Sequence, residues 1–243
     1  MPPLAGIHPV REALRAGNPL EHVLIAKGLG GPRIQELIEL CRQRKIPVRF
    51  EARAQLDRAA QSAAHQGVVA IGAAERYTTL EQSTAGRGLH VVLDGIEDPH
   101  NLGAIVRTAH AAGAAAVVIP ERRAAGLTET VARTSAGALA YLPVVRVPSH
   151  REVLEWAGEL RGDGVPVQVV GTDERGPVEI AEQDLTGPTV LAVGNETHGL
   201  SAAWREACDR MVRIPITGAV SSLNAASAAS VALYEAARQR RSV

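Results

Sequence analysis

The chain has 243 residues, of which 46% are hydrophobic, and its 26 basic and 26 acidic residues give a formal net charge of zero at pH 7. Zero net charge argues against a nucleic-acid-binding protein that relies on a global positive field. The length is compatible with one large α/β domain or with a small domain followed by a medium one, and either can bury a hydrophobic core.

The cysteines and the apolar runs exclude several further classes. Cys41 and Cys208 are far apart, with no Cys-x-x-Cys or Cys…His spacing, so neither a disulfide framework nor a zinc site is indicated. The N-terminal stretch lacks a basic region followed by an apolar one, and no apolar run approaches the roughly 18 residues of a membrane span. We therefore expect a soluble cytoplasmic protein with no membrane partner and no metal.

Helix-period and strand-like runs alternate through the first 72 residues. Helices are expected over 8–17, 31–45 and 53–62, and strands over 22–27, 46–52 and 67–73. Gly17 closes the first helix and Pro32 opens the second. The pattern predicts a small βαβ-type domain, which carries 10 basic against 6 acidic residues.

A polar segment separates this domain from the rest. Residues 73–88, "AAERYTTLEQSTAGRG", are typical of a linker, although a helical turn around Leu80 stays open. Strands are then expected over 89–96, 114–120, 142–147, 165–173, 189–196 and 211–216, and helices over 101–113, 149–160, 201–208 and from Asn224 onward. Near-continuous apolar strands separated by helices predict a parallel sheet covered on both faces. Residues 89–243 carry 14 basic against 18 acidic residues.

The first turn of this second part is unusual for a nucleotide-binding protein. The stretch "LDGIEDPHNLGAIVRTAHAAGA", residues 93–114, runs from a strand into a helix without the glycine spacing of a phosphate-binding loop. Asn101 is a good helix N-cap, and that role alone would explain it. Arg107 is either a solvated arginine or one placed to hold a phosphate at the carboxyl edge of the sheet.

Two later segments also place polar residues at the ends of apolar strands. They are "LAVGNETHGLS", residues 191–201, and "IPITGAVSSLNAASAAS", residues 214–230. Each alone is an ordinary loop followed by a helix cap. Together with residues 93–114 they collect Asn, Arg, Glu and Ser side chains at the ends of three strands, where α/β proteins bind their ligands.

These segments resemble a known family. "DPHNLGAIVRTA", "GNETHGLS" and "IPITGAVSSLNAAS" are similar to the three motifs of the SpoU (TrmH-type) ribose 2'-O-methyltransferases of the SPOUT superfamily. "GIHPVREAL" and "HQGVVA" resemble the small L30e-like RNA-binding domain of the RlmB-type branch, which methylates a guanosine of large-subunit ribosomal RNA. The resemblance implies an L30e-like substrate-binding domain over 1–72, a linker over 73–88, and a SPOUT catalytic domain over 89–243 with a parallel sheet and a C-terminal deep trefoil knot.

The resemblance also implies a cofactor and a reaction. S-adenosyl-L-methionine would be held by backbone groups of the knotted loops, with Gly194, Ile214 and Leu223 in contact. A methyl group would pass in line from its sulfonium to a ribose 2'-hydroxyl. The protein would have to align the two centres and help to remove the hydroxyl proton.

The catalytic residues carried over by motif are Asn101, Arg107, Glu196, Ser222 and Asn224. In the family Arg107 would meet the RNA phosphate and the 2'-hydroxyl. An arginine is a poor base because its pKa is above about 12, so we expect it to orient the phosphate and to lower the pKa of the hydroxyl. Asn101 would fix that arginine or the ribose, and Glu196 would hold the network through one of the two. Ser222 and Asn224 would complete the pocket.

One position departs from the family pattern. Many relatives read S-L-N-V-S where this chain has "SLNAAS", with Ala225 and Ala226. Because Ser222 and Asn224 are kept, we expect catalysis to be unaffected and the packing near the cofactor to be looser.

The basic first domain fits contacts with an RNA backbone, and a solvated helix face is the alternative. With six aromatic residues in the whole chain, base stacking cannot be the main grip, so binding should weaken steeply with salt. We interpret His8 and His65 as turn or packing residues. The candidate RNA contacts are Arg11, Arg15, Arg33, Arg42, Arg44, Lys45 and Arg49.

Several assignments stay open at this point. The resemblance implies a homodimer, whereas a final helix buried within the monomer would have the same small-residue pattern. A tRNA guanosine or an rRNA adenosine 2'-O-methyltransferase is the alternative within the enzymes. A non-catalytic RNA-binding ribosome assembly factor is the alternative of another class, and the presence of the five motif side chains argues against it.

Overall fold

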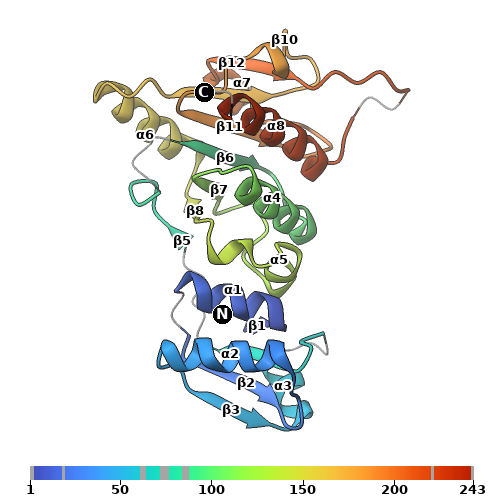
Figure 1. The fold of residues 1–243 in the computed structure, drawn as a ribbon. Coiled ribbons are helices and arrows are strands. Elements are labelled where there is room, and N and C mark those ends of the chain that lie inside the picture. The colour runs from blue at the N-terminus through green and yellow to red at the C-terminus, as the bar shows by residue number, and fades with distance from the viewer. Residues whose placement is uncertain are drawn as a thin grey trace. The chain divides into compact units, whose positions relative to one another are not determined.

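The computed structural model describes residues 3–17, 20–60, 64–71, 77–83, 88–219 and 222–241. By its internal contacts the chain forms two compact units, which are treated separately below (Figure 1). The first unit comprises Met1–Arg76 and Gly126–Tyr141, and the second comprises Tyr77–Ala125 and Leu142–Val243. No helix among the described residues is long and apolar enough to cross a membrane.

The first unit is built on a mixed four-stranded sheet in the order β1-β4-β2-β3. The parallel pair β2–β3 agrees with the predicted βαβ arrangement, whereas β4 is antiparallel to β2 and β1 is antiparallel to β4. The strands are β1 (Leu4–Ala5), β2 (His22–Ala26), β3 (Val48–Glu51) and β4 (Val68–Ile71). The helices are α1 (Ile7–Ala16), α2 (Pro32–Gln43) and α3 (Arg53–Ala60).

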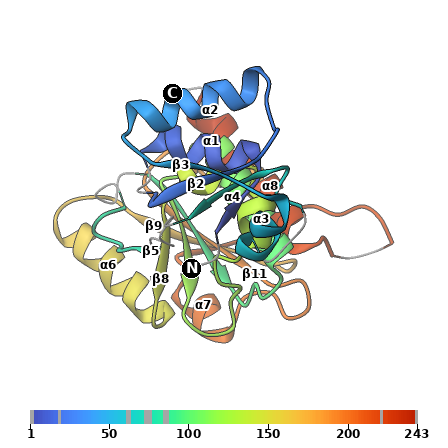
Figure 2. The same cartoon turned by 90° about the horizontal axis from the view of Figure 1, so that it is seen from below.

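Alternation along the central strand β2 divides this unit into two layers. Val23 and Ile25 pack with residues of α1 and α2, and Leu24 and Ala26 pack with residues of α3. Helices α1 and α2 lie side by side (Figure 2). The predicted ends are confirmed: Pro32 is the first residue of α2, and Gly17 ends α1.

Two short helices from the middle of the chain complete the first unit, and the sequence pattern did not predict them. They are α5 (Glu129–Thr134), which contacts β1, and η2 (Ala138–Ala140), which contacts α1. The Tyr141 hydroxyl donates a hydrogen bond to the Glu12 carboxylate on α1. Gly137 adopts φ +94°, and a Cβ there would lie 2.7 Å from Cγ of Glu12, so this close approach requires glycine.

The two histidines that were interpreted as turn or packing residues have different surroundings. His65 is fully buried, its Nδ1 accepts a hydrogen bond from the Gly67 amide at 2.9 Å, and its Nε2 lies 2.8 Å from Asp57. The interpretation of His65 as a packing residue is therefore confirmed. His8 is exposed on α1, with its Nδ1 3.1 Å from the Arg11 guanidinium.

The second unit contains an eight-stranded sheet in which every neighbouring pair is parallel, as predicted. The strand order is β10-β12-β9-β11-β6-β7-β8-β5. Strand β11 thus lies between β6 and β9, two strands that both precede it in the chain. The strands are β5 (Tyr77–Thr78), β6 (Leu89–Asp94), β7 (Ala116–Pro120), β8 (Val144–Val147), β9 (Gln168–Thr172), β10 (Val178–Glu179), β11 (Thr189–Gly194) and β12 (Arg210–Arg213).

Helices cover both faces of this sheet, again as predicted. Helices α4 and α8 pack against each other, α4 on β7 and α8 on β11 (Figure 1). Helices α6 and α7 pack on the other face, where Val92 of β6 shares a core with Trp156 and Trp204. The helices are α4 (Pro99–Ala111), α6 (His150–Gly162), α7 (Ala202–Ala207) and α8 (Ala225–Arg240), and a short η3 spans Ile180–Glu182.

Part of the predicted linker is ordered against the second unit. Tyr77 and Thr78 form β5, which pairs with β8, and Leu80 is buried in the core that contains Trp156. Residues 72–76 and 84–87 lie outside the described part of the chain. The linker boundaries therefore stay a prediction.

Candidate functional site

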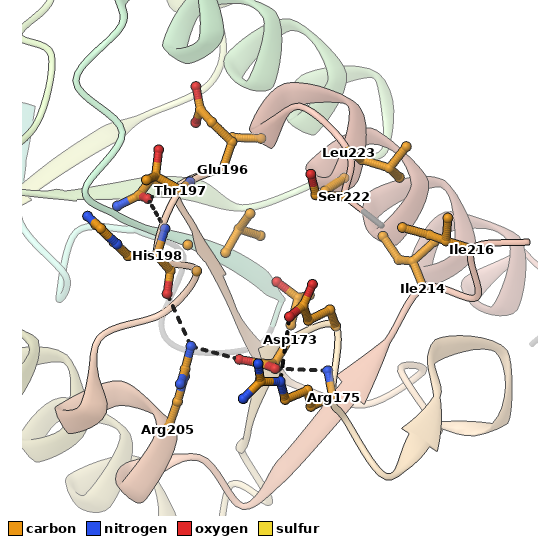
Figure 3. A pocket seen from close by; sticks show the side chains of 18 residues that line it. Asp173, Arg175, Glu196, Thr197, His198, Arg205, Ile214, Ile216, Ser222 and Leu223 are labelled. Carbon is orange, nitrogen blue, oxygen red and sulfur yellow. Dashed lines mark hydrogen bonds and ion pairs between the residues drawn. The ribbon is translucent and has the colours of Figure 1, made fainter. Parts of the chain in front are cut away.

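A cavity of about 340 Å³ lies where the loops that follow β9, β11 and β12 meet, at the carboxyl ends of parallel strands (Figure 3). Ligands of open α/β sheets bind at this edge. The lining residues are Thr172, Asp173, Glu174, Arg175, Val193, Gly194, Asn195, Glu196, Thr197, His198, Gly199, Arg205, Ile214, Ile216, Ser222, Leu223, Ala225 and Ala228.

Gly194 marks a crossing of backbone over backbone at the end of β11. A Cβ on Gly194 would lie 2.0 Å from the carbonyl carbon of Gly199 and 2.2 Å from the amide nitrogen of Leu200. Real side chains never approach backbone so closely, so only glycine allows the chain to fold back over its own strand end. This crossing forms one wall of the cavity.

The folded-back loop is held by Asn195. Its side-chain Oδ1 accepts hydrogen bonds from the amides of Thr197 and His198, at 3.0 and 2.8 Å. Its backbone carbonyl accepts from the Gly199 amide at 2.9 Å. An asparagine that closes a turn in this way presents the other backbone groups of the loop in a fixed arrangement.

One guanidinium connects two of the cavity loops. Arg205 of α7 lies 3.0 Å from the Asp173 carboxylate, after β9, and donates to the His198 carbonyl, after β11, at 3.1 Å (Figure 3). The other carboxylate oxygen of Asp173 accepts from the Arg175 amide at 2.9 Å. The sequence pattern did not predict this contact between residues 173 and 205, because its only signal was an aspartate at the end of the predicted strand 165–173.

The opposite side of the cavity is apolar. Ile214, Ile216 and Leu223 contribute side chains to it, and the last two are more than a third exposed, at 38% and 36%. Exposed large apolar side chains around a concave surface are typical of a binding site for a partly apolar ligand. Figure 3 shows them grouped away from the charged Asp173 and Arg205.

The start of α4 corrects one expectation. The N-cap is Asp98, whose carboxylate accepts a hydrogen bond from the His100 amide at 2.9 Å, and not Asn101. Pro99 explains the difference, because proline favours the first helical position and thereby makes the preceding residue the cap. Asn101 is consequently free of the capping role and lies buried within the first turn, 8% exposed.

Asn101 instead connects the first and third motifs. Its side-chain oxygen accepts a hydrogen bond from the Asn224 amide group at 3.0 Å. Asn224 is the N-cap of α8, as the predicted start of that helix implied, and accepts from the amides of Ala226 and Ser227. A second link between α4 and α8 joins the hydroxyls of Thr108 and Ser230 at 3.2 Å.

Arg107 and Glu196 are the least restrained of the predicted catalytic residues. Both are exposed, and neither side chain makes a hydrogen bond or an ion pair with another residue of the described ranges. Glu196 lines the cavity, whereas Arg107 projects from α4. Glu196 was expected to contact Arg107 or Asn101, and among the described residues its side chain makes no hydrogen bond or ion pair with either.

The predicted site residues thus fall into two groups. Gly194, Glu196, Ile214, Ser222 and Leu223 line the cavity. Asn101, Arg107 and Asn224 lie on α4 and at the start of α8, outside the cavity lining. Ala225 and Ala226, the two residues that depart from the family pattern, are buried, with exposures of 2% and 9%.

Neither cysteine has the properties of a nucleophile. Burial raises the pKa of the Cys41 thiol to about 11, and burial together with the charge of Asp209 raises that of Cys208 to about 12. At neutral pH both thiols are protonated and unreactive. Among the described residues, no group of three or more His, Cys, Asp or Glu side chains could hold a metal ion.

Two family models match the chain, one over each of its two parts. The family model described as "SpoU rRNA Methylase family" matches residues 88–234, and that described as "RNA 2'-O ribose methyltransferase substrate binding" matches residues 3–78. The chain is 40% identical to the 23S rRNA (guanosine-2'-O-)-methyltransferase RlmB of Pseudomonas syringae pv. tomato, over 97% of this chain and 94% of that protein.

Two solved structures are similar along nearly the whole chain. The SpoU methyltransferase AviRb from Streptomyces viridochromogenes, solved in complex with the cofactor AdoMet, is 37% identical with a TM-score of 0.87, over 99% of this chain and 91% of that one. An AdoMet-bound rRNA methyltransferase from Sinorhizobium meliloti is 28% identical with a TM-score of 0.78, over 96% and 85%.

Proposed function

Because the chain belongs to the SpoU rRNA Methylase family, we propose that it transfers a methyl group from S-adenosyl-L-methionine to the 2'-hydroxyl of a ribose in RNA. The observation that carries the proposal is the cavity whose wall is the backbone crossing at Gly194, with the Asn101–Asn224 bridge joining the other two motifs. The substrate we propose is a guanosine of 23S ribosomal RNA. The support for that choice is the relative of this stated activity, which matches both parts of the chain.

The cavity residues suit this cofactor. Ile214 and Leu223 offer apolar contact for an adenine ring, and the backbone around Gly194 offers hydrogen-bonding groups at close range. Three carboxylates and two guanidiniums line the same cavity, a balance that favours a ligand carrying positive charge. When bound, the cofactor supplies the activated methyl group and its own leaving group.

The protein's own contribution is alignment and charge stabilisation. The Asn101–Asn224 hydrogen bond holds the start of α4 against the start of α8, next to Ser222 and Leu223. Arg107, two turns further along α4, has no partner among the described residues and is free to bind an RNA phosphate. There its charge would orient the ribose and lower the pKa of the 2'-hydroxyl, with no need for the guanidinium to act as a base.

We propose that the first unit supplies the L30e-like RNA-binding function over residues 1–72 and that the protein acts in the cytoplasm on its ribosomal RNA substrate. Of the candidate RNA contacts, Arg11 and Arg15 form ion pairs with Glu12 or Glu36. Arg42 also pairs with Glu39 at 3.9 Å, and the Arg44 guanidinium donates to the Arg15 carbonyl at 3.0 Å. The side chains of Arg33, Lys45 and Arg49 are exposed, make no such contact within the described ranges, and are available to phosphates.

We also propose the deep trefoil knot and the homodimer of the family. The insertion of β11 between β6 and β9 and the backbone crossing at Gly194 support a threaded chain path. The dimer is supported by two exposed apolar side chains on α8, Val231 at 43% and Tyr234 at 70%. A monomer by light scattering would count against the dimer, and an experimental chain trace whose joined ends leave no trefoil would count against the knot.

The reaction is tested by incubating the protein with labelled cofactor and separately purified ribosomal RNA and tRNA. The proposal predicts label in 23S rRNA and no label in tRNA. Label in tRNA alone would support the tRNA alternative, and label on a 23S adenosine would replace guanosine as the target. RNA binding without label in either RNA would support the non-catalytic assembly factor.

A further inference from the structure

A second cavity, of about 140 Å³, lies at the carboxyl ends of β6, β7 and β8 in the same unit. None of its lining residues lines the first cavity. Its polar and aromatic lining residues are Asp94, Arg122, Arg123, Ser149, His150, Ser201 and Trp204. Neither the proposed cofactor cavity nor the Asn101–Asn224 bridge includes any of these residues.

The two cavities flank one pair of strands. Asp94, which lines the second cavity, is directly opposite Gly194 of the first in the register of β6 and β11. The Ser201 amide donates to the Asp94 carboxylate at 2.7 Å, so the loop that follows Gly194 ends on the second cavity. The second cavity therefore adjoins the first at the carboxyl edge of the sheet.

The charge of the second cavity favours an anion. Arg122 is exposed and has no ion pair or hydrogen bond among the described residues. The ion pair of Arg123 with Glu97 is long, 4.0 Å, with side chains 74% and 65% exposed, and such pairs contribute little. Asp94, the one carboxylate in the lining, already accepts the Ser201 amide.

The backbone around the cavity fits the same ligand. Arg123 has φ +59°, a conformation that is uncommon for residues other than glycine and that often occurs at functional sites. His150 begins the 13-residue helix α6, whose N-cap Ser149 makes no side-chain capping bond. The free amides of a first helical turn add partial positive charge to that of the two arginines.

We propose that this cavity is a second phosphate subsite, which binds an RNA phosphodiester next to the methylated nucleotide through Arg122 and Arg123. The inference rests on the proposed function, since it assigns the anion to the RNA substrate of that reaction. Arg107 would hold one phosphate on α4, and the second subsite would fix the direction in which the strand leaves the site.

The test compares the double variant Arg122→Ala/Arg123→Ala with wild type in binding to 23S rRNA at several salt concentrations. We expect affinity to fall about 10–100-fold and the slope of log affinity against log salt to lessen by roughly 1–2, because two phosphate contacts are lost. Cofactor affinity should stay within twofold. Arg122→Lys/Arg123→Lys, which keeps the charge, should recover most of the salt slope.

The matched control is Arg210→Ala/Arg241→Ala, which removes the same charge from exposed positions outside the cavity. Equal RNA affinity in the two double alanine variants would overturn the proposal. Wild type could fail to methylate RNA while its salt-dependent RNA affinity still fell in Arg122→Ala/Arg123→Ala and not in the control. The proposed reaction would then be wrong, and the phosphate subsite would stand.

A direct readout uses the two tryptophans of the chain. Trp204 lines the cavity, whereas Trp156 is a core residue outside the lining. Inorganic phosphate added at constant ionic strength should shift the indole N–H resonance of Trp204 and leave that of Trp156 in place, and the shift should vanish in Arg122→Ala/Arg123→Ala. A Trp204 shift with unchanged 23S rRNA affinity in that variant would assign the cavity to free phosphate and overturn its role toward RNA.

Discussion

The two sides of the candidate site are built in different ways. On the proposed cofactor side backbone passes backbone, since a Cβ on Gly194 would lie 2.0 Å from Gly199. On the proposed substrate side, side chains meet, as in the Asn101–Asn224 hydrogen bond. The shape of the first side therefore depends on the chain path, whereas that of the second depends on individual functional groups.

This difference predicts separable defects, of which loss of Arg107 should be the largest. Arg107→Ala should lower methyl transfer by about 10³-fold or more, because a positioned charge at the reacting centre is removed. Cofactor affinity should stay within a few fold, since Arg107 does not line the cavity. Single-turnover transfer and calorimetric binding of S-adenosylhomocysteine measure the two quantities. If transfer persisted in this variant, the role given to Arg107 would be wrong.

Gly194→Ala should produce the opposite pattern. The added methyl group cannot be placed without moving the Gly199 backbone, so cofactor affinity should fall about 100-fold or more. Calorimetry with S-adenosylhomocysteine measures it.

Gly158→Ala is the control for that substitution, because nothing lies within 4 Å of a Cβ at this position in α6. It should bind cofactor normally and raise the free energy of unfolding by about 1 kcal/mol. Equal affinity in the two variants would refute the description of the cavity wall.

Arg205→Met tests whether the connection between the loops matters for binding. Its guanidinium contacts Asp173 and His198 and none of the proposed catalytic residues. We expect the Kd for the cofactor to rise roughly fivefold, a modest effect because the arginine is half-exposed. The rate of methyl transfer at saturating cofactor should change less than the Kd does. Arg210→Met, outside this cavity, is the control, and a fall in rate at saturating cofactor without a change in Kd would contradict the positioning role.

The Asn101–Asn224 bridge should contribute to both stability and catalysis. Asn101→Ala leaves the Asn224 amide group without its partner and should lower the free energy of unfolding by about 1–2 kcal/mol. Asn224→Ala also loses the α8 cap, worth about 1 kcal/mol. Denaturant unfolding of the two single variants and the double variant should give a coupling of about 0.5–1.5 kcal/mol, whereas strict additivity would show that the hydrogen bond contributes nothing.

His90 provides a baseline away from both sides of the site. It is buried beside Trp156 and hydrogen-bonded to Ser83, and burial lowers its pKa below the ordinary value. The unfolded chain therefore binds the proton more readily. Stability should fall as the pH drops below about 6.5, with a slope of at most about 1.4 kcal/mol per pH unit from this group. His90→Gln should flatten that slope in urea unfolding without changing cofactor affinity at pH 8, and an unchanged slope would assign the acid sensitivity elsewhere.

Local patterns predicted the features that depend on neighbouring residues. The parallel sheet, the end of α1 at Gly17 and the start of α8 after Asn224 follow from periodicity and capping. Asn101 was assigned wrongly as a cap because Pro99 selects Asp98. The two-residue strands β1 and β10 are too short to show a period of two.

Features that depend on distant residues could not be predicted this way. The packing of η2 against α1 joins segments more than a hundred residues apart in the chain. The Arg205–Asp173 contact and the antiparallel β4 likewise depend on the chain path. The motif residues could be placed at one sheet edge because the carboxyl ends of parallel strands share that edge, but their division between cavity and helix surface required the structure.

The most direct test of the proposed reaction is identification of the methylated nucleoside. Unmodified 23S rRNA is treated with wild type or Arg107→Ala and labelled cofactor, digested to nucleosides and analysed by mass spectrometry. We predict labelled 2'-O-methylguanosine with wild type and none with the variant, although both proteins bind cofactor. A label on a base, on another ribose, or in equal amount with both proteins would contradict it.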